Sequence, residues 1–199
     1  MPAKFDRRRA TVLAFDAADW EPPEALVIDT NVIAETMLPD EAEYASCKAL
    51  LGRLVEAKTV VVFNRMLELE LWEVVYEHAL RRAVPGRDRR VRRFDKHVRS
   101  GPAVALARAQ SLWNEILDDL TWERVEIREV ADAVPDLMRA YGLQSYDAVH
   151  AATLLTSGVS DMVTRDTGFA VLLPEDATLH TTRRRLGRTR ARRRDTCGG

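Results

Sequence analysis

Short apolar runs alternate with amphipathic segments along most of this 199-residue chain, and this alternation restricts the fold more than any other feature. The runs are rich in β-branched or other apolar residues and have the length of buried strands. They cover residues 25–29, 58–64, 122–127, 160–164 and 177–181. Strands that alternate with helices predict a parallel sheet covered by helices on both faces, which is a three-layer α/β/α sandwich.

The order of these segments predicts one main domain with three additions. Hydrophobic residues make up 46% of the chain, which is enough for a substantial core. We expect this core in residues 25–182, after a loose N-terminal arm over 1–24 that shows little periodicity. Residues 81–120 predict an expanded helical region, and residues 183–199 predict an Arg-rich disordered tail. Helices are expected over residues 41–57, 65–82, 89–98, 103–120, 128–142 and 145–158.

Several classes of protein are excluded by what the sequence lacks. No apolar run approaches the ~18 residues of a membrane span, and no apolar stretch follows the first basic residues as in a secretory signal. Cys47 and Cys197 are the only cysteines, so neither a disulfide framework nor a zinc pattern is expected. Gly-rich phosphate-binding loops and the G-x-S-x-G nucleophile motif are also absent. These features indicate a protein of the reducing cytoplasm.

Charge is distributed unevenly along the chain. Residues 81–100 and residues 183–199 each carry a formal charge of +7, so the remaining 162 residues carry −15 within a net charge of −1. An acidic body with basic appendages is typical of a protein that binds a polyanion. A solvated helix face and a disordered tail are the alternative explanation for the two basic segments.

Three aspartates are placed where such a sheet predicts a shared site. Asp29 ends the first predicted strand, Asp166 follows the strand over 160–164, and Asp147 lies in the first turn of a helix. In open parallel sheets, ligands bind at the edge where the carboxyl ends of the strands meet. Each aspartate alone is also explained by helix capping, a turn or the helix dipole. Together the three aspartates indicate one acidic pocket.

The helix over 65–82 supplies a fourth acid, but its spacing does not identify the residue. Its apolar face centres between Leu67 and Leu71, and at about 100° per residue Glu68 and Glu70 flank that face. Several carboxylates in one cleft repel one another unless a divalent cation binds, and oxygen ligands favour Mg²⁺, with Mn²⁺ as the alternative. Such an ion activates water for attack on a phosphodiester.

Four stretches of the chain resemble the PIN-domain family, and within it the VapC-type ribonuclease toxins of bacterial toxin–antitoxin pairs. They are "VIDTNVI", the acidic helix after the second strand, "GLQSYDAVHAATLL" and "VTRDTGF", which follow the family's order within residues 25–182. "DTN" alone is a weak signal, whereas "YDAVHAA" followed downstream by "TRD.GF" is quite specific. The N-terminal arm, the region 81–120 and the Arg-rich tail depart from typical members.

The resemblance implies a Mg²⁺-dependent endoribonuclease built on an α/β/α sandwich. The family's acids are carried over onto Asp29, Glu70, Asp147 and Asp166, with Glu68 as the alternative to Glu70. Supporting roles are implied for Asn31 and Thr164. Homodimers are also implied, as is inhibition by a small VapB-type antitoxin whose C-terminal segment covers the active site. The side chains expected to bind RNA are Arg89, Arg90, Arg92 and Arg93.

Two other functions are compatible with the sequence. An RNA-processing PIN-domain nuclease without an antitoxin has the same acids, whereas a non-catalytic RNA-binding protein uses only the two basic segments. The full set of acids argues against the second of these. His150 lies one turn after Asp147, where a general base could act, but its place beside Ala151 and Ala152 favours a buried structural histidine.

Overall fold

The protein is built on a six-stranded sheet in which all neighbouring strands are parallel. The computed structural model describes residues 10–84, 100–171 and 176–187. The strands are β1 (Thr11–Ala14), β2 (Ala25–Ile28), β3 (Val60–Asn64), β4 (Thr121–Val125), β5 (Asp161–Val163) and β6 (Thr178–Thr181). Their order is β1-β6-β5-β2-β3-β4, so β5, β2 and β3 are all interior strands.

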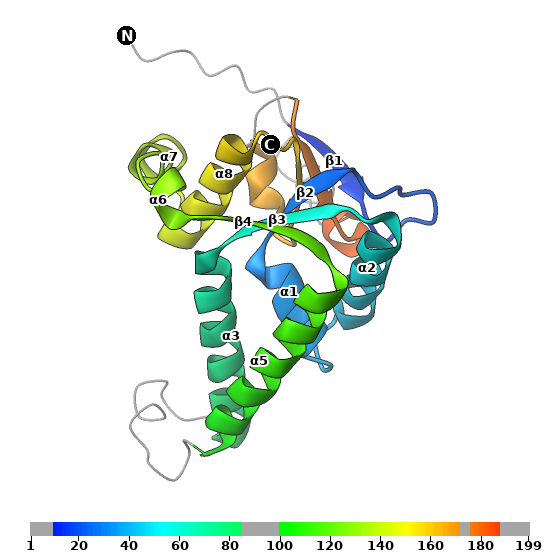
Figure 1. Cartoon of the computed structure of the whole chain (residues 1–199), viewed down its shortest axis with the longest axis vertical. Coiled ribbons are helices and arrows are strands. Elements are labelled where there is room, and N and C mark those ends of the chain that lie inside the picture. The colour runs from blue at the N-terminus through cyan, green and yellow to red at the C-terminus, as the bar shows by residue number, and fades with distance from the viewer. Residues whose placement is uncertain (1–9, 85–99, 172–175, 188–199) are drawn as a thin grey trace, which may run out of the picture.

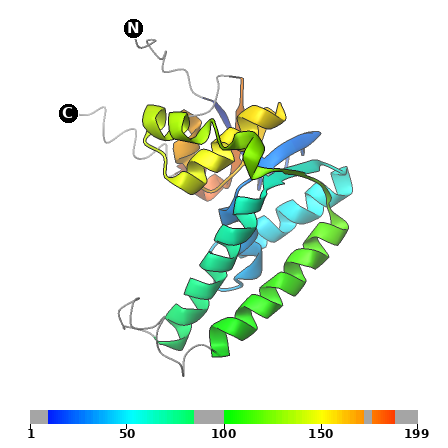
Figure 2. The same ribbon diagram turned by 60° about the vertical axis from the view of Figure 1, so that its left-hand side comes forward.

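Helices cover both faces of the sheet, which confirms the predicted α/β/α sandwich (Figure 1). The helices on one face are α1 (Thr30–Met37), α2 (Tyr44–Ala57), α3 (Arg65–Ala83) and α5 (Ser100–Asp119). Those on the other face are α6 (Ile127–Val130), α7 (Val134–Tyr141), α8 (Ser145–Ser157) and the 3₁₀ helix η1 (Thr167–Val171). Leu26 and Ile28 pack toward the first face and Val27 toward the second, as the alternation of a strand requires. α3 and α5 lie side by side and project from the sheet (Figure 2).

The N-terminal arm differs most from the prediction, because part of it joins the sheet. β1 pairs in parallel with β6, and Phe15 and Trp20 after it are buried. Arg53 holds this stretch by lying over the Trp20 ring and donating hydrogen bonds to two carbonyls of the arm. The expectation of a loose arm is therefore wrong for residues 10–24. β1 is a short edge strand without a fully buried residue, so it has almost no apolar periodicity to detect.

Two further predictions, one of a helix and one of disorder, are also corrected. The helix expected over 128–142 is split into α6 and α7, because Pro135 has no N–H to donate and its ring clashes with the preceding turn of a continuous helix. Residues 183–187, expected to be disordered, form a short helix. The rest of the tail and most of the basic segment 81–100 lie outside the described residues. Within the described ranges, no helix is long and apolar enough to cross a membrane.

Candidate active site

Asp29 lies at the carboxyl end of β2, where it caps α1. Its Oδ2 accepts hydrogen bonds from the side-chain amide of Asn31 and the hydroxyl of Thr164. Only 5% of the residue is exposed. Burial, reinforced by the negative charge of Glu70, raises the pKa of the Asp29 carboxyl although His150 acts in the opposite direction. The carboxyl group is thus desolvated and its hydrogen bonds come from uncharged donors, so a nearby cation would stabilise its ionised form.

Thr164 links the carboxyl ends of β2 and β5. Besides donating to Asp29, its hydroxyl accepts from the Asn31 amide at 3.1 Å and from the Asp166 backbone N–H at 2.9 Å. The Asn31 side-chain oxygen accepts from the backbone N–H of Arg165 at 2.9 Å. Asn31 and Thr164, the residues predicted to support the site, therefore tie the loop after β5 to Asp29.

α3 turns Glu70 toward this network and Glu68 away from it. Glu70 Oε2 lies 3.2 Å from His150 Nε2, whereas Glu68 accepts a hydrogen bond of 3.1 Å from the Trp113 indole on α5. Partial burial acts to raise the pKa of Glu70, but hydrogen bonds with His150 and Thr30 outweigh it and lower that pKa. Helical spacing did not distinguish the two glutamates because both flank the apolar stripe. The packing of α3 against α5 and α8 separates them.

Asp147 and Asp166 lie on the more exposed side of the site. Asp147 is in the first turn of α8, and the pKa of its carboxyl is raised by burial and by the charges of Asp29, Asp166 and Glu70. Because the charges of the other three acids act on Asp147, the four predicted acids are here called the acidic cluster. Asp166 is exposed, and its Oδ1 accepts from the Gly168 N–H at 2.8 Å. A side chain at position 168 would crowd that oxygen, since a Cβ there would lie 3.0 Å away.

His150 belongs to this site, although the sequence analysis did not assign it there. The prediction that it is buried is confirmed by its 1% exposure, but it is buried among acids. Its Nε2 lies 3.2 Å from Thr30 Oγ1 and 3.7 Å from Asp29 Oδ1, in addition to its contact with Glu70. Burial acts to lower the pKa of the imidazole, but Glu70 and Asp29 outweigh it and raise that pKa. The sequence feature that could have placed His150 at the site is its i, i+3 spacing from Asp147, which puts both side chains on one helix face.

The site has a donor set that fits a divalent cation. Asp29, Glu70 and His150 each offer one ligand atom, and these atoms all lie within 4.8 Å of one another. That spacing is close to the separation of ligands that bind one ion at about 2.0–2.2 Å. Among the described residues, no Lys or Arg is paired with any member of the acidic cluster. Within these residues, the cluster therefore carries negative charge that arginine and lysine do not neutralise.

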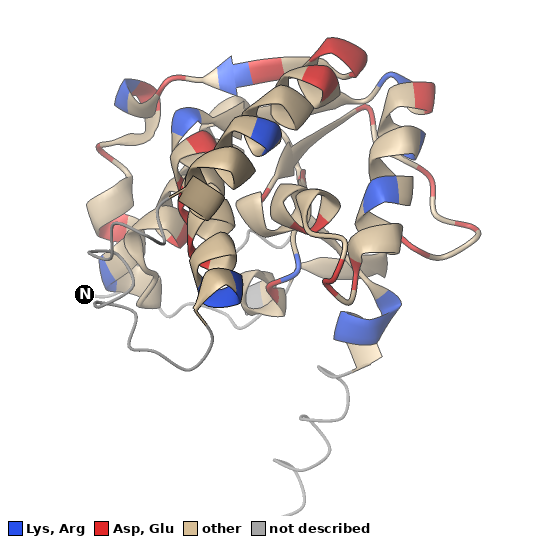
Figure 3. Ribbon diagram, turned by 90° about the horizontal axis from the view of Figure 1, so that it is seen from below, with Lys and Arg blue, Asp and Glu red and all other residues tan. Residues whose placement is uncertain are grey.

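A second buried acidic pair lies beside the site and is neutralised by arginine. Glu35 and Glu43 are 1% and 3% exposed. Arg165, next to Asp166 in the chain, pairs with both glutamates. Arg185 pairs with Glu43 at 3.1 Å. This network connects the loop that carries Asp166 to the C-terminal helix 183–187, whose basic residues are visible in Figure 3.

The side chains predicted to bind RNA, Arg89, Arg90, Arg92 and Arg93, lie outside the described residues. From the Arg-rich tail, Arg183 and Arg184 are described and exposed. Arg183 pairs with Asp16 at 3.7 Å, so at least one tail arginine is partly engaged by the arm.

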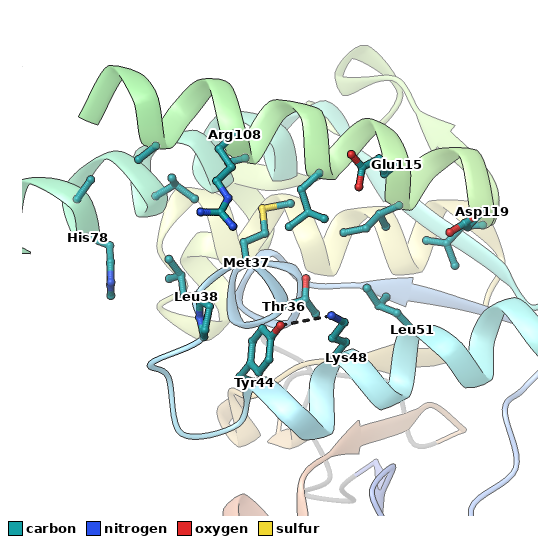
Figure 4. Close-up of a pocket in the computed structure, with 18 of the residues that line it drawn as sticks. Thr36, Met37, Leu38, Tyr44, Lys48, Leu51, His78, Arg108, Glu115 and Asp119 are labelled. Atoms are coloured by element: carbon teal, nitrogen blue, oxygen red, sulfur yellow. Dashed lines mark hydrogen bonds between the residues drawn. The ribbon is translucent and has the colours of Figure 1, made fainter. Parts of the chain in front are cut away.

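A groove with a volume of about 1000 Å³ opens between α1, α2, α3 and α5. Apolar side chains such as Leu51 line much of it, and its two ends differ in charge (Figure 4). His78 and Arg108 lie toward one end, and Glu115 and Asp119 lie toward the other. An amphipathic segment with an acidic and a basic end would match this distribution.

Comparison with known proteins gives one family match. The family model described as "PIN domain" matches residues 26–172, a range that contains the whole acidic cluster. No curated protein sequence gives a significant match.

Among solved structures, three from different organisms are similar to the chain. VapBC2 from Rickettsia felis, bound to a DNA fragment from its promoter, has 12% identity over 79% of this chain and 98% of that chain, with a TM-score of 0.47. VapC20 from Mycobacterium tuberculosis, described as a sarcin–ricin loop cleaving toxin, has 17% identity over 75% and 97%, with a TM-score of 0.47. FitAcB from Neisseria gonorrhoeae has 18% identity over 78% and 96%, with a TM-score of 0.48.

Proposed function

The chain belongs to the PIN-domain family, and we propose that it is a metal-dependent endoribonuclease that acts as the toxin of a VapBC-type pair. The main support is that ligand atoms of Asp29 and Glu70 lie, with His150, within 4.8 Å of one another, and that the charges of Asp147 and Asp166 interact beside them. These acids come from four separate segments of the chain. Like charges gathered in one pocket oppose folding unless a ligand compensates them, so their convergence favours a functional site.

The acids have different tasks in this proposal. Asp29 and Glu70 hold the ion, with Asp147 beside them, and Mg²⁺ is expected in preference to Mn²⁺. When bound, the cation lowers the pKa of a water molecule and offsets charge that develops on the phosphoryl oxygens. Asp166 is exposed, which suits a carboxylate that orients the attacking water and takes its proton. In-line attack leaves a 5′-phosphate and a 3′-hydroxyl.

RNA is the proposed substrate because the chain combines two basic segments with an acidic body. Phosphate contacts from arginine position a nucleic acid without reading its sequence. Arg89, Arg90, Arg92 and Arg93 are the proposed contacts. Arg184, exposed in the C-terminal helix, is a further candidate from the tail. Neutralising these charges should weaken RNA binding and reduce its dependence on salt.

A VapB-type antitoxin is the proposed inhibitor, and we expect the toxin itself to form a homodimer. The groove between α1, α2, α3 and α5 supports a peptide partner because apolar side chains line much of it and its two ends differ in charge. We propose that the antitoxin places acidic residues near Arg108 and basic residues near Glu115. Its C-terminal segment then covers the acidic cluster. Co-purification with the product of a short neighbouring reading frame tests the pairing, and light scattering tests the dimer.

Cleavage of total RNA tests the central proposal. The wild-type protein should cut RNA in the presence of Mg²⁺ and stop when EDTA is added. Asp29→Asn should abolish cleavage, whereas Glu68→Gln is the matched control on the same helix as Glu70 and should remain active. Undiminished cutting by Asp29→Asn or in EDTA would remove the metal mechanism.

The two alternative functions make different predictions. An RNA-processing nuclease without an antitoxin would cleave in the same assay, yet would not arrest growth when expressed alone. A non-catalytic RNA-binding protein would keep its cellular activity after Asp147→Ala and lose it when the Arg-rich tail is deleted. A growth assay on induced expression, combined with mapping of new RNA 5′ ends, distinguishes all three.

A further inference from the structure

His150 contacts members of the acidic cluster, and nothing in the proposed reaction requires a histidine there. The side chain is contributed by α8, and its Nε2 is aimed at three oxygens. These belong to Glu70 on α3 and Thr30 on α1, each at 3.2 Å, and to Asp29 at 3.7 Å. One nitrogen therefore contacts three elements that converge on the site.

We propose that His150 is a positioning residue that holds the Glu70 carboxylate in place for the metal by donating its Nε2–H, without binding the metal itself. This inference rests on the proposed metal-dependent function. Glu70 is partly exposed on a long side chain, so without a fixed donor it can rotate toward solvent. Hydrogen bonds to ligating carboxylates hold them in orientations that suit the ion.

The other ring nitrogen argues against His150 as a ligand. Nδ1 is buried and has no hydrogen-bond partner among the described residues. If Nε2 bound the ion, the ring proton would sit on Nδ1, as a buried N–H without an acceptor. Histidine ligands usually donate that second N–H to a carboxylate or carbonyl, which is missing here. With the proton on Nε2, the donor faces Glu70 and Thr30.

Burial also argues against His150 as a general base. The residue is 1% exposed, and its Nε2 already faces the carboxylates of Glu70 and Asp29. A base must come within hydrogen-bonding distance of the proton that it takes, directly or through one water. Asp166, which is exposed, meets this condition better.

Metal affinity tests the inference without relying on cleavage. The dissociation constant for Mn²⁺ is measured from the EPR signal of the free ion, for the wild type, His150→Gln and His150→Leu. The leucine variant removes the donor at similar volume and should weaken binding about 10- to 100-fold, as loss of an outer-sphere partner does. The glutamine variant retains an amide N–H near the position of Nε2 and should stay within about 3-fold of the wild type, a difference of at most about 0.7 kcal/mol in binding free energy.

A second buried histidine provides the matched control. His180 is 2% exposed, and its side chain bonds with Trp20 and Asp161 instead of with a member of the acidic cluster. His180→Leu should lower thermal stability while leaving the Mn²⁺ affinity unchanged. If His150→Leu also lowered only stability, His150 would be purely structural and the inference would be wrong.

The EPR spectrum of the bound ion separates positioning from ligation. Electron spin-echo modulation of Mn²⁺ in the wild-type protein should show no coupling to a directly bound imidazole nitrogen. A nitrogen coupling that disappears in His150→Gln would overturn the inference, as would equally poor binding by the glutamine and leucine variants. The spin-echo measurement uses only the wild type and His150→Gln, so it does not require His150→Leu to fold correctly. Failure of the wild type to bind Mn²⁺ would instead overturn the proposed function, and the inference with it.

Discussion

Replacing Thr164 with valine should both destabilise the protein and weaken metal binding, because one hydroxyl serves both the fold and the site. The valine has nearly the same shape, so the change removes hydrogen bonds with little loss of packing. Thr164 is fully buried, and its hydroxyl bonds with Asp29, Asn31 and Asp166. Water therefore cannot replace the lost contacts without rearrangement of the loop.

The size of the effect follows from these three contacts. A hydrogen bond to a charged group contributes about 1.5–3 kcal/mol, and an ordinary one about 1 kcal/mol. Asn31 retains its bond with Asp29, and the Asp166 N–H lies near solvent, so these two losses are partly offset. We expect a decrease of about 3 kcal/mol in the free energy of unfolding, or about 6–12 °C in Tm for a chain of this size.

Urea unfolding in EDTA, followed by Mn²⁺ titration, measures both consequences. Thr36→Val is the matched control, because Thr36 is also buried but its hydroxyl donates only to the Ile33 carbonyl, at 2.7 Å. The control should lose about 1 kcal/mol and bind Mn²⁺ normally, whereas Thr164→Val should bind it about 10- to 100-fold more weakly. Equal destabilisation by the two substitutions, with equal metal affinity, would refute the account of Thr164 as the link between β2 and β5.

Three further predictions concern the charges of the site and its neighbourhood. Asp147→Asn should stabilise the metal-free protein at neutral pH, because burial and the nearby acids raise the pKa of the Asp147 carboxyl. A group with a raised folded pKa lowers the free energy of unfolding as the pH rises from its unfolded to its folded pKa. In urea titrations at several pH values, the gain should disappear below the ordinary pKa of 3.8, and an unchanged gain there would contradict this explanation. Mg²⁺ at 100 times its Kd should stabilise the wild type by about 2.7 kcal/mol, or about 5–11 °C in Tm, and Asp29→Asn should show no shift in the same melting experiment. Arg165→Met should lower the free energy of unfolding, measured in urea, by about 3–5 kcal/mol, because it leaves buried Glu35 and Glu43 with too little compensating charge. An almost unchanged free energy of unfolding would mean that water already reaches these two glutamates.

The central strands were predictable because they are buried on both faces and therefore rich in apolar residues. β2, β3 and β5 lie inside the sheet, and their runs stand out against the helices. β1 has no such signal, because it lies at an edge and its residues are exposed or half-buried. What holds the arm is the pairing of β1 with β6 and the contact of Arg53 with Trp20. Contacts between residues so far apart in the chain leave no local pattern.

The site shows the same division between local and distant information. Asp29 was predictable because an acid directly after a buried strand must lie at the sheet edge. The choice between Glu68 and Glu70 depends on the packing of α3 against α5, where Trp113 takes Glu68 as its partner. The contact of His150 with Glu70 likewise depends on the distance between α8 and α3, which one-dimensional spacing does not contain.

Two groups of acids at the same edge of the molecule show why only one of them suits a metal. Glu35 and Glu43 are compensated by Arg165 and Arg185, so a cation would have to displace a guanidinium to bind there. The acidic cluster has no such arginine or lysine partner within the described residues, and uncharged donors orient Asp29. Arg165 adjoins Asp166 in the chain, yet its guanidinium is held by the two glutamates. By engaging this nearby cation, Glu35 and Glu43 leave the cluster with the negative charge that a divalent ion requires.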